Sequence, residues 1–246
     1  MQLIEMLAND LFGFGLLIGY FVIAGLPMVL LKTSNRLSFE VARKLYHLVI
    51  TVSIIPIMTL FSSWHVTVLV VLFLMAIIYP ILARVENTSF FERIAVERSN
   101  GEFKQSLVVV QITIAILIVV FWGLLGDSWK YVVIVAVLAW GFGDAAAALV
   151  GKTFGKNHIQ HPWLEGKKTY EGTFAMFIVA GLTIFFTLLI FTGQPWYLNV
   201  AVALLVAPIG ATVELFTRRG MDTLTVPLAV GFSVLLLMLF LSFLSI

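Results

Sequence analysis

Asp144 is an acidic residue in a long apolar stretch of the sequence, VVIVAVLAWGFGDAAAALVG. An uncompensated carboxylate within a membrane costs several kcal/mol, so such a residue is a functional candidate by default. It lies seven residues before Gly151, about 10 Å along a helix, a depth suited to work where lipid headgroups meet the cytosol. In the alternative interpretation, Asp144 pairs with a lysine or caps a broken helix.

Phosphate binding is suggested by Lys167-Lys168-Thr169 followed by Glu171-Gly172. Adjacent ammonium groups can hold polyphosphate charge, and backbone amides beside glycines can add hydrogen bonds. Thr169 is expected to cap the next helix or to hold a phosphate. The alternative is that these lysines only satisfy the charge rule for membrane topology.

A third polar group precedes another apolar stretch. Glu40, Arg43, Lys44 and His47 have the spacing that places residues on one helix face. One acid, two bases and an imidazole along one helix face can bind a phosphate. Alternatively, Glu40 pairs with Lys44 within the helix, and Arg43 only sets topology.

Two acids, Glu214 and Asp222, flank Arg218 and Arg219. Together with Asp144 they could bind Mg²⁺, which favours a few carboxylates plus phosphate oxygens. Otherwise Glu214 forms a salt bridge with Arg218 one helical turn later, and Asp222 caps the following helix.

The composition predicts the environment of these groups. The chain has 246 residues, 61% hydrophobic and 11% charged, against about 25% charged in soluble domains. That excludes a soluble globular domain and a disordered chain. The absence of cysteine excludes disulfides, cysteine zinc sites and thiol catalysis, and a net charge of +2 gives no sign of nucleic-acid binding.

We therefore predict an all-α fold, a polytopic membrane helical bundle forming a single integral membrane domain over residues 1–246. A spanning helix needs about 20 mostly apolar residues, and about eight segments qualify. They are 11–31, 45–61, 64–82, 106–125, 129–150, 172–193, 197–214 and 224–245.

The basic residues predict the orientation. Lys and Arg cluster in alternate loops, 32–44, 83–105, 151–171 and 215–223, and Lys130 is the one basic residue of 15 on the other side. The positive-inside rule places these loops in the cytoplasm and both termini outside. Loop 83–105 is expected to carry a short surface helix over 90–98 and no chemistry.

The motifs occur together, in this order, in a known family. They are Arg43-Lys44-x-x-His47, Asp144-x-x-Ala147-x-x-x-Gly151 with Gly155-Lys156, Lys168-Thr169-x-Glu171-Gly172-Thr173, and Glu214 followed by Asp222-x-x-Thr225-x-Pro227-Leu228. Over residues 40–230 the chain resembles the polyprenol kinase family, which includes dolichol, phytol and farnesol kinases and CTP-dependent diacylglycerol kinase. Its central part is also similar to phosphatidate cytidylyltransferase. Where the family usually has Asp-Asn, this chain has Asp222-Thr223, which alters any contact made by that amide.

The resemblance implies transfer of the γ-phosphoryl group of a nucleotide, expected to be CTP, to the hydroxyl of an isoprenoid alcohol or diacylglycerol. It implies catalytic roles for Asp144, Lys168, Glu171 and His47, and Mg²⁺ binding by Asp144, Asp222 and Glu214. It implies nucleotide contacts from Arg43, Lys44, Gly151, Gly155, Lys156, Lys167, Thr169 and Gly172.

Two other functions remain as alternatives. A cytidylyltransferase would join CMP to a lipid phosphate and release pyrophosphate. A transporter of lipids or small anions would need charged residues deep in several spans and polar features on both faces. The expected partners are a lipid alcohol and a nucleotide, and the small residues 143–151 would also allow packing between two copies of the chain.

Overall fold

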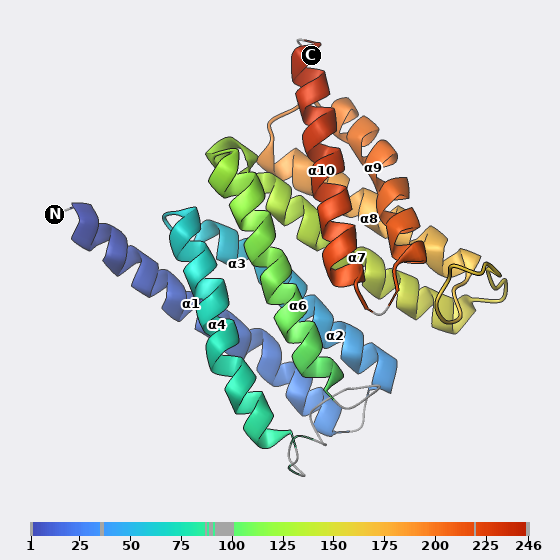
Figure 1. The fold of residues 1–246 in the computed structure, drawn as a ribbon, viewed down its shortest axis with the longest axis horizontal. Coiled ribbons are helices and arrows are strands. Elements are labelled where there is room, and N and C mark those ends of the chain that lie inside the picture. The colour runs from blue at the N-terminus through green and yellow to red at the C-terminus, as the bar shows by residue number, and fades with distance from the viewer. Residues whose placement is uncertain are drawn as a thin grey trace. The chain divides into compact units, whose positions relative to one another are not determined.

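The computed structural model describes residues 2–34, 37–86, 88, 91, 101–218 and 220–244. Over these residues the chain is helical, and its one β-type pairing is an isolated bridge between His158 and Thr169. The all-α prediction is therefore confirmed. Figure 1 shows the succession of long helices.

The helices in chain order account for all eight predicted spans. Eight of the helical stretches in the described part of the chain are long and apolar enough to cross a membrane, so the chain is a multi-pass membrane protein. The elements are α1 (Gln2–Thr33), α2 (Phe39–Val52), α3 (Ile54–Thr59), α4 (Trp64–Val85), α6 (Glu102–Leu117), η1 (Ile118–Leu124), η2 (Asp127–Trp129), α7 (Lys130–Phe154), α8 (Tyr170–Phe191), α9 (Trp196–Phe216) and α10 (Asp222–Phe243).

The structure corrects the ends of several spans. The span predicted over 45–61 is divided at Ser53 into α2 and α3. Pro56 explains the division, because proline has no N–H for the carbonyl four residues earlier and its ring crowds that carbonyl. The span predicted to end at residue 150 continues to Phe154. Asp144 thus lies ten residues before the helix end, about 15 Å rather than about 10 Å.

The chain divides into two compact units, residues 1–124 and 125–246. The expectation of a single membrane domain over 1–246 stays a prediction. The surface helix expected over 90–98 falls on residues outside the described ones, apart from Phe91.

In the first unit, polar contacts hold α1 to the helices that follow it. Asp10, only 8% exposed, accepts hydrogen bonds from the backbone N–H of Ser62 at 2.8 Å and from its hydroxyl at 2.7 Å. The Tyr20 hydroxyl donates to the Val49 carbonyl at 2.6 Å. Within this unit α1 packs against α2, and α4 packs against α6 and η1.

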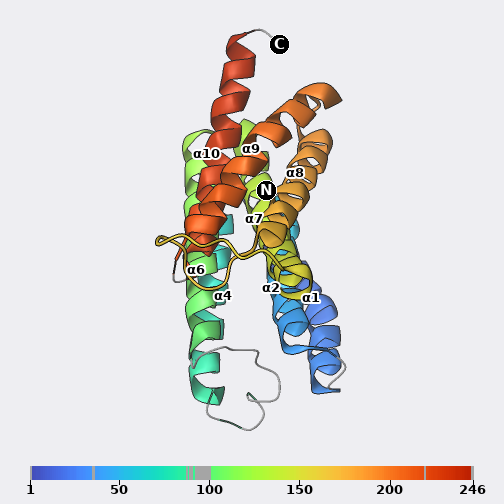
Figure 2. The same cartoon turned by 90° about the vertical axis from the view of Figure 1, so that its right-hand side faces the viewer.

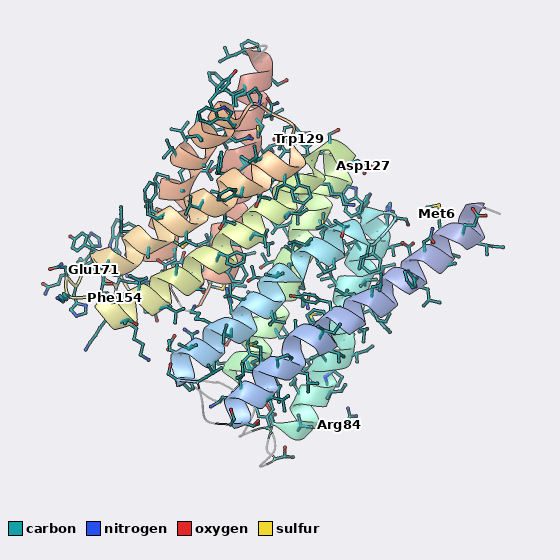
Figure 3. All side chains as sticks on the ribbon, turned by 180° about the vertical axis from the view of Figure 1, so that it is seen from behind. Met6, Arg84, Asp127, Trp129, Phe154 and Glu171 are labelled. Carbon is teal, nitrogen blue, oxygen red and sulfur yellow. The ribbon has the colours of Figure 1, made fainter. Side chains whose placement is uncertain are left out.

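The second unit is a closed ring of four helices. Helix α7 packs against α8, α8 against α9, α9 against α10, and α10 against α7. Helix α7 is buried without interruption from Val132 to Gly141, which follows from its continuous apolar sequence. Figure 3 shows Asp127 and Trp129 at one end of α7, and Phe154 at its other end beside Glu171 at the start of α8.

The predicted orientation can be tested on α7, because the natural chain has no cysteine. Ser128 lies in η2, directly before α7, and Thr153 lies in the last turn of α7; both are exposed. We expect a membrane-impermeant maleimide to label Ser128→Cys in intact cells, and Thr153→Cys only after permeabilisation. The reverse labelling pattern would invert the predicted topology.

Candidate functional site

The connection from α7 to α8 turns back on itself as a narrow hairpin. The Ile159 amide donates to the Lys168 carbonyl and the Tyr170 amide to the Asn157 carbonyl, each at 3.0 Å. These bonds flank the bridge between His158 and Thr169. Lys167 and Lys168, which the sequence predicts as phosphate ligands, therefore lie on the returning arm of an ordered hairpin.

Glu171 fastens the start of this hairpin to the first turn of α8. Its carboxylate accepts hydrogen bonds from the backbone amides of Lys156 and Asn157, both at 3.2 Å, and from the Asn157 side-chain amide at 2.8 Å. A negative charge is also favourable at a helix N-terminus. The structure thus gives Glu171 a positioning role, and its predicted catalytic role stays a prediction.

Thr169 caps α8, as one of its two predicted roles requires. Its hydroxyl accepts a hydrogen bond from the Gly172 amide at 3.1 Å, and Thr169 is only 5% exposed. The Gly172 amide is therefore used in the cap of α8, and Gly172 supports the start of this helix through that hydrogen bond.

The glycines of the motif allow α7 and α8 to approach closely around Thr169. A Cβ atom at Gly172 would lie 2.9 Å from the Ala147 carbonyl oxygen, and one at Gly151 would lie 3.1 Å from the Thr169 hydroxyl oxygen. A Cβ at Gly155 would overlap the Gly151 carbonyl and the Thr169 side chain. Gly151, Gly155 and Gly172 thus form the packing surface beneath the hairpin, and their predicted nucleotide contacts stay predictions.

An ion pair joins the hairpin to α9. The Lys168 ammonium donates to the Glu214 carboxylate, and also reaches the Glu214 backbone carbonyl at 3.4 Å. Glu214 is only 6% exposed. The alternative of a salt bridge between Glu214 and Arg218 is replaced by this contact, which spans 46 residues of sequence.

Asp144 and Asp222 lie within electrostatic range of Glu214. The charges of both carboxylates act on the Glu214 carboxyl group, so side chains from α7, α9 and α10 face the same region of the second unit. Asp222 is the first residue of α10, and the N-cap position belongs to Met221. The alternative in which Asp222 caps this helix is therefore wrong.

Asp144, Asp222 and Glu214 are the three side chains that the sequence predicts as Mg²⁺ ligands. Among the described residues, no three His, Cys, Asp or Glu side chains gather tightly enough to hold a metal ion by themselves. Mg²⁺ commonly takes only one or two protein carboxylates and completes its shell with water and substrate phosphates. Asp144 and Asp222 fit that partial role, while Glu214 is occupied by Lys168.

Arg218 makes a contact that sequence reasoning missed. Its guanidinium donates to the carbonyls of Trp163 at 2.9 Å and Pro162 at 3.0 Å, so the turn after α9 holds the tip of the hairpin. Figure 2 shows the connection from α7 to α8 beside the facing ends of α9 and α10. Trp163, Phe216 and Arg218 also line an open hollow there. Arg219 lies outside the described residues.

The remaining predicted site residues belong to the first unit. Arg43, Lys44 and His47 lie on α2, where Arg43 forms an ion pair with Glu40 one turn earlier. Glu40 and Lys44 are buried, with 6% and 4% of their surfaces exposed. Their part in nucleotide or alcohol binding stays a prediction.

Comparison with known proteins supports the resemblance drawn from the motifs. The chain is 37% identical over 94 residues to a phytol kinase of Synechocystis sp.. The match spans 38% of this chain and 38% of the length of that relative. No protein-family model and no solved structure matches the chain. The match confirms the resemblance to the polyprenol kinase family.

The close approach at Gly172 predicts the effect of adding one methyl group. Gly172→Ala should lower the free energy of unfolding by about 1–3 kcal/mol, because the new Cβ meets backbone that cannot move aside. Gly19→Ala is the control, since nothing lies within 4 Å of a Cβ placed there. Thermal unfolding in detergent measures both variants, and equal stability for the two would contradict the predicted packing.

The ion pair of the half-buried Lys168 with the buried Glu214 predicts an asymmetric response to substitution. Lys168→Met should destabilise the protein by about 3–5 kcal/mol, because it leaves a buried carboxylate without its counter-charge. Lys168→Met combined with Glu214→Met should recover much of that loss. If the losses of the two single variants simply add in the double variant, the two side chains are not coupled.

Proposed function

We propose that the chain transfers the terminal phosphoryl group of a nucleoside triphosphate, CTP, to the hydroxyl of an isoprenoid alcohol of the phytol type. The observation that carries the proposal is the ion pair between Lys168 and Glu214, with Asp144 and Asp222 within electrostatic range of the same Glu214 carboxylate. The likeness to a phytol kinase supports the reaction class. The positive-inside rule supports a cytoplasmic location for this end, where nucleotides are available.

Phosphoryl transfer depends mainly on positioning and on neutralising the charge of phosphate oxygens. Lys168 is held in place by Glu214, and Lys156 and Lys167 are exposed on the two arms of the same hairpin. In the proposal, these three ammonium groups hold the triphosphate. Arg43, Lys44 and His47 belong to the first unit, and their predicted roles in contacting phosphates or orienting the alcohol stay predictions.

The carboxylates would act on the acceptor. The oxygen of the lipid hydroxyl forms the new P–O bond, the bond between the γ-phosphorus and the bridging oxygen breaks, and the nucleoside diphosphate leaves. A carboxylate oxygen of Asp144 takes the hydroxyl proton. Asp144 and Asp222 would also hold Mg²⁺, which when bound neutralises charge on the β- and γ-phosphate oxygens.

The likeness to a phytol kinase supports an alcohol as the acceptor and favours the kinase over the cytidylyltransferase.

A labelling experiment tests the reaction class and the substrate together. The purified protein is incubated with CTP labelled at the α- or the γ-phosphate, and with phytol, farnesol, diacylglycerol or phosphatidate. We expect γ-label in phytyl phosphate and release of CDP. Transfer of α-label into phosphatidate with pyrophosphate release would establish the cytidylyltransferase instead, and transfer of neither label would contradict both enzymes. ATP in parallel reactions tests the donor.

Asp144→Asn should reduce phytol phosphorylation by about 10²–10³-fold, because it removes a charge that acts at the reacting groups. Asp127→Asn is the matched control at the opposite end of the same helical span and should keep at least half of the activity. Both variants should keep the unfolding temperature of the natural chain within a few degrees. If Asp144→Asn retains activity within threefold, Asp144 is not central to the reaction.

A further inference from the structure

Arg218 has no role in the reaction proposed above, yet it makes two directed hydrogen bonds to a distant segment. Its Nε donates to the Trp163 carbonyl at 2.9 Å and its Nη2 to the Pro162 carbonyl at 3.0 Å. Trp163 lies 55 residues before Arg218 in the sequence, and Pro162 lies 56 residues before it. Two parallel donors in a fixed plane suit two successive carbonyls, and a guanidinium provides this fork where an ammonium cannot.

The segment held by Arg218 is the tip of the hairpin. The tip is ordered by a turn, in which the Leu164 amide donates to the His161 carbonyl at 3.1 Å. The Trp163 amide also donates to Nδ1 of His161 at 3.2 Å. The His161 ring meets Phe216 edge to face, with 5.7 Å between ring centroids. The tip is thus fastened to the end of α9 and the turn that follows it.

The same short stretch of chain therefore holds the hairpin twice. Glu214 binds Lys168 on the returning arm, and Arg218, four residues later, binds the tip. Lys168 is itself one of these two attachments, and Lys167 lies directly before it on the side of the tip. Without the contact at the tip, the arm that carries both lysines is held by the hydrogen bonds between the two arms and by the Lys168 ion pair.

We propose that Arg218 is a positioning residue for nucleotide binding: it holds the hairpin 156–169 over the turn between α9 and α10, so that Lys167 and Lys168 are set for the triphosphate. The inference rests on the proposed function and adds a residue to it. It assigns Arg218 to the nucleotide side of the reaction and leaves the lipid side independent of it.

The test compares three variants by steady-state kinetics with CTP and phytol. Arg218→Gln should raise the KM for CTP about tenfold, with the KM for phytol within twofold and kcat within threefold of the natural chain. Arg218→Lys keeps the charge but loses the forked pair of donors, so its KM for CTP should lie between that of the natural chain and that of Arg218→Gln. Arg84→Gln is the matched control: it also removes an exposed arginine that donates to a backbone carbonyl, that of Pro80, and it should change neither KM.

Hydrogen exchange of the same proteins separates positioning from direct contact. Arg218→Gln should increase exchange at the amides of Ile159 and Leu164 at least tenfold, and Arg84→Gln should not. A raised KM for CTP with unchanged exchange would mean that Arg218 touches the nucleotide, which overturns the inference. An unchanged KM for CTP in an active Arg218→Gln enzyme overturns it as well.

The two proposals fail in distinguishable ways. If the natural chain phosphorylates no lipid alcohol, the proposed function fails, and CTP binding to the natural and variant proteins then tests Arg218 directly. Weaker CTP binding together with faster hairpin exchange in Arg218→Gln would still support its positioning role. Equal CTP binding by both proteins would overturn that role.

Discussion

The ion pair between the half-buried Lys168 and the buried Glu214 is the contact on which the rest of the site depends. Glu214 is almost fully buried and faces the negative charges of Asp144 and Asp222. A carboxylate in such surroundings is stable as an anion only with a counter-charge at close range. Because the counter-charge comes from the connection between α7 and α8, this connection has to be ordered, and Thr169 and Glu171 fix the helix start directly after it.

The site is built on rigid helices because small residues bring α7 and α8 together beneath it. Helix α7 presents Ala147 and Gly151, and α8 presents Gly172, at distances that exclude a larger side chain. Functional groups held on packed helices keep their geometry better than groups on loops. Asp144 and Asp222 have this support directly, whereas Lys168 obtains it through its contact with α9.

Much of the fold could be predicted from the sequence, and the limits have physical reasons. Eight apolar stretches predict eight spans because a membrane helix must satisfy its backbone internally over about 20 residues. The apolar stretch predicts the end of this span at residue 150, which is too early: in the structure Gly151 lies inside α7 as a packing surface. The role of Thr169 as a cap followed from local spacing. The partners of Glu171, Glu214 and Arg218 did not, since each contact joins residues at least 14 positions apart.

The convergence of motifs so distant in sequence follows from the helix order of the second unit. In a ring of successive helices joined by turns, the end of α7, the start of α8, the end of α9 and the start of α10 lie at one end of the bundle. Asp144, ten residues before the end of α7, and Asp222, at the start of α10, can therefore both act on Glu214 although 78 positions separate them. The opposite end, with η2 and the turn between α8 and α9, carries Lys130 as its one basic residue in the part that the structure describes. The carboxylates predicted to react and the cations predicted to bind a polyphosphate thus lie toward the same end of the unit.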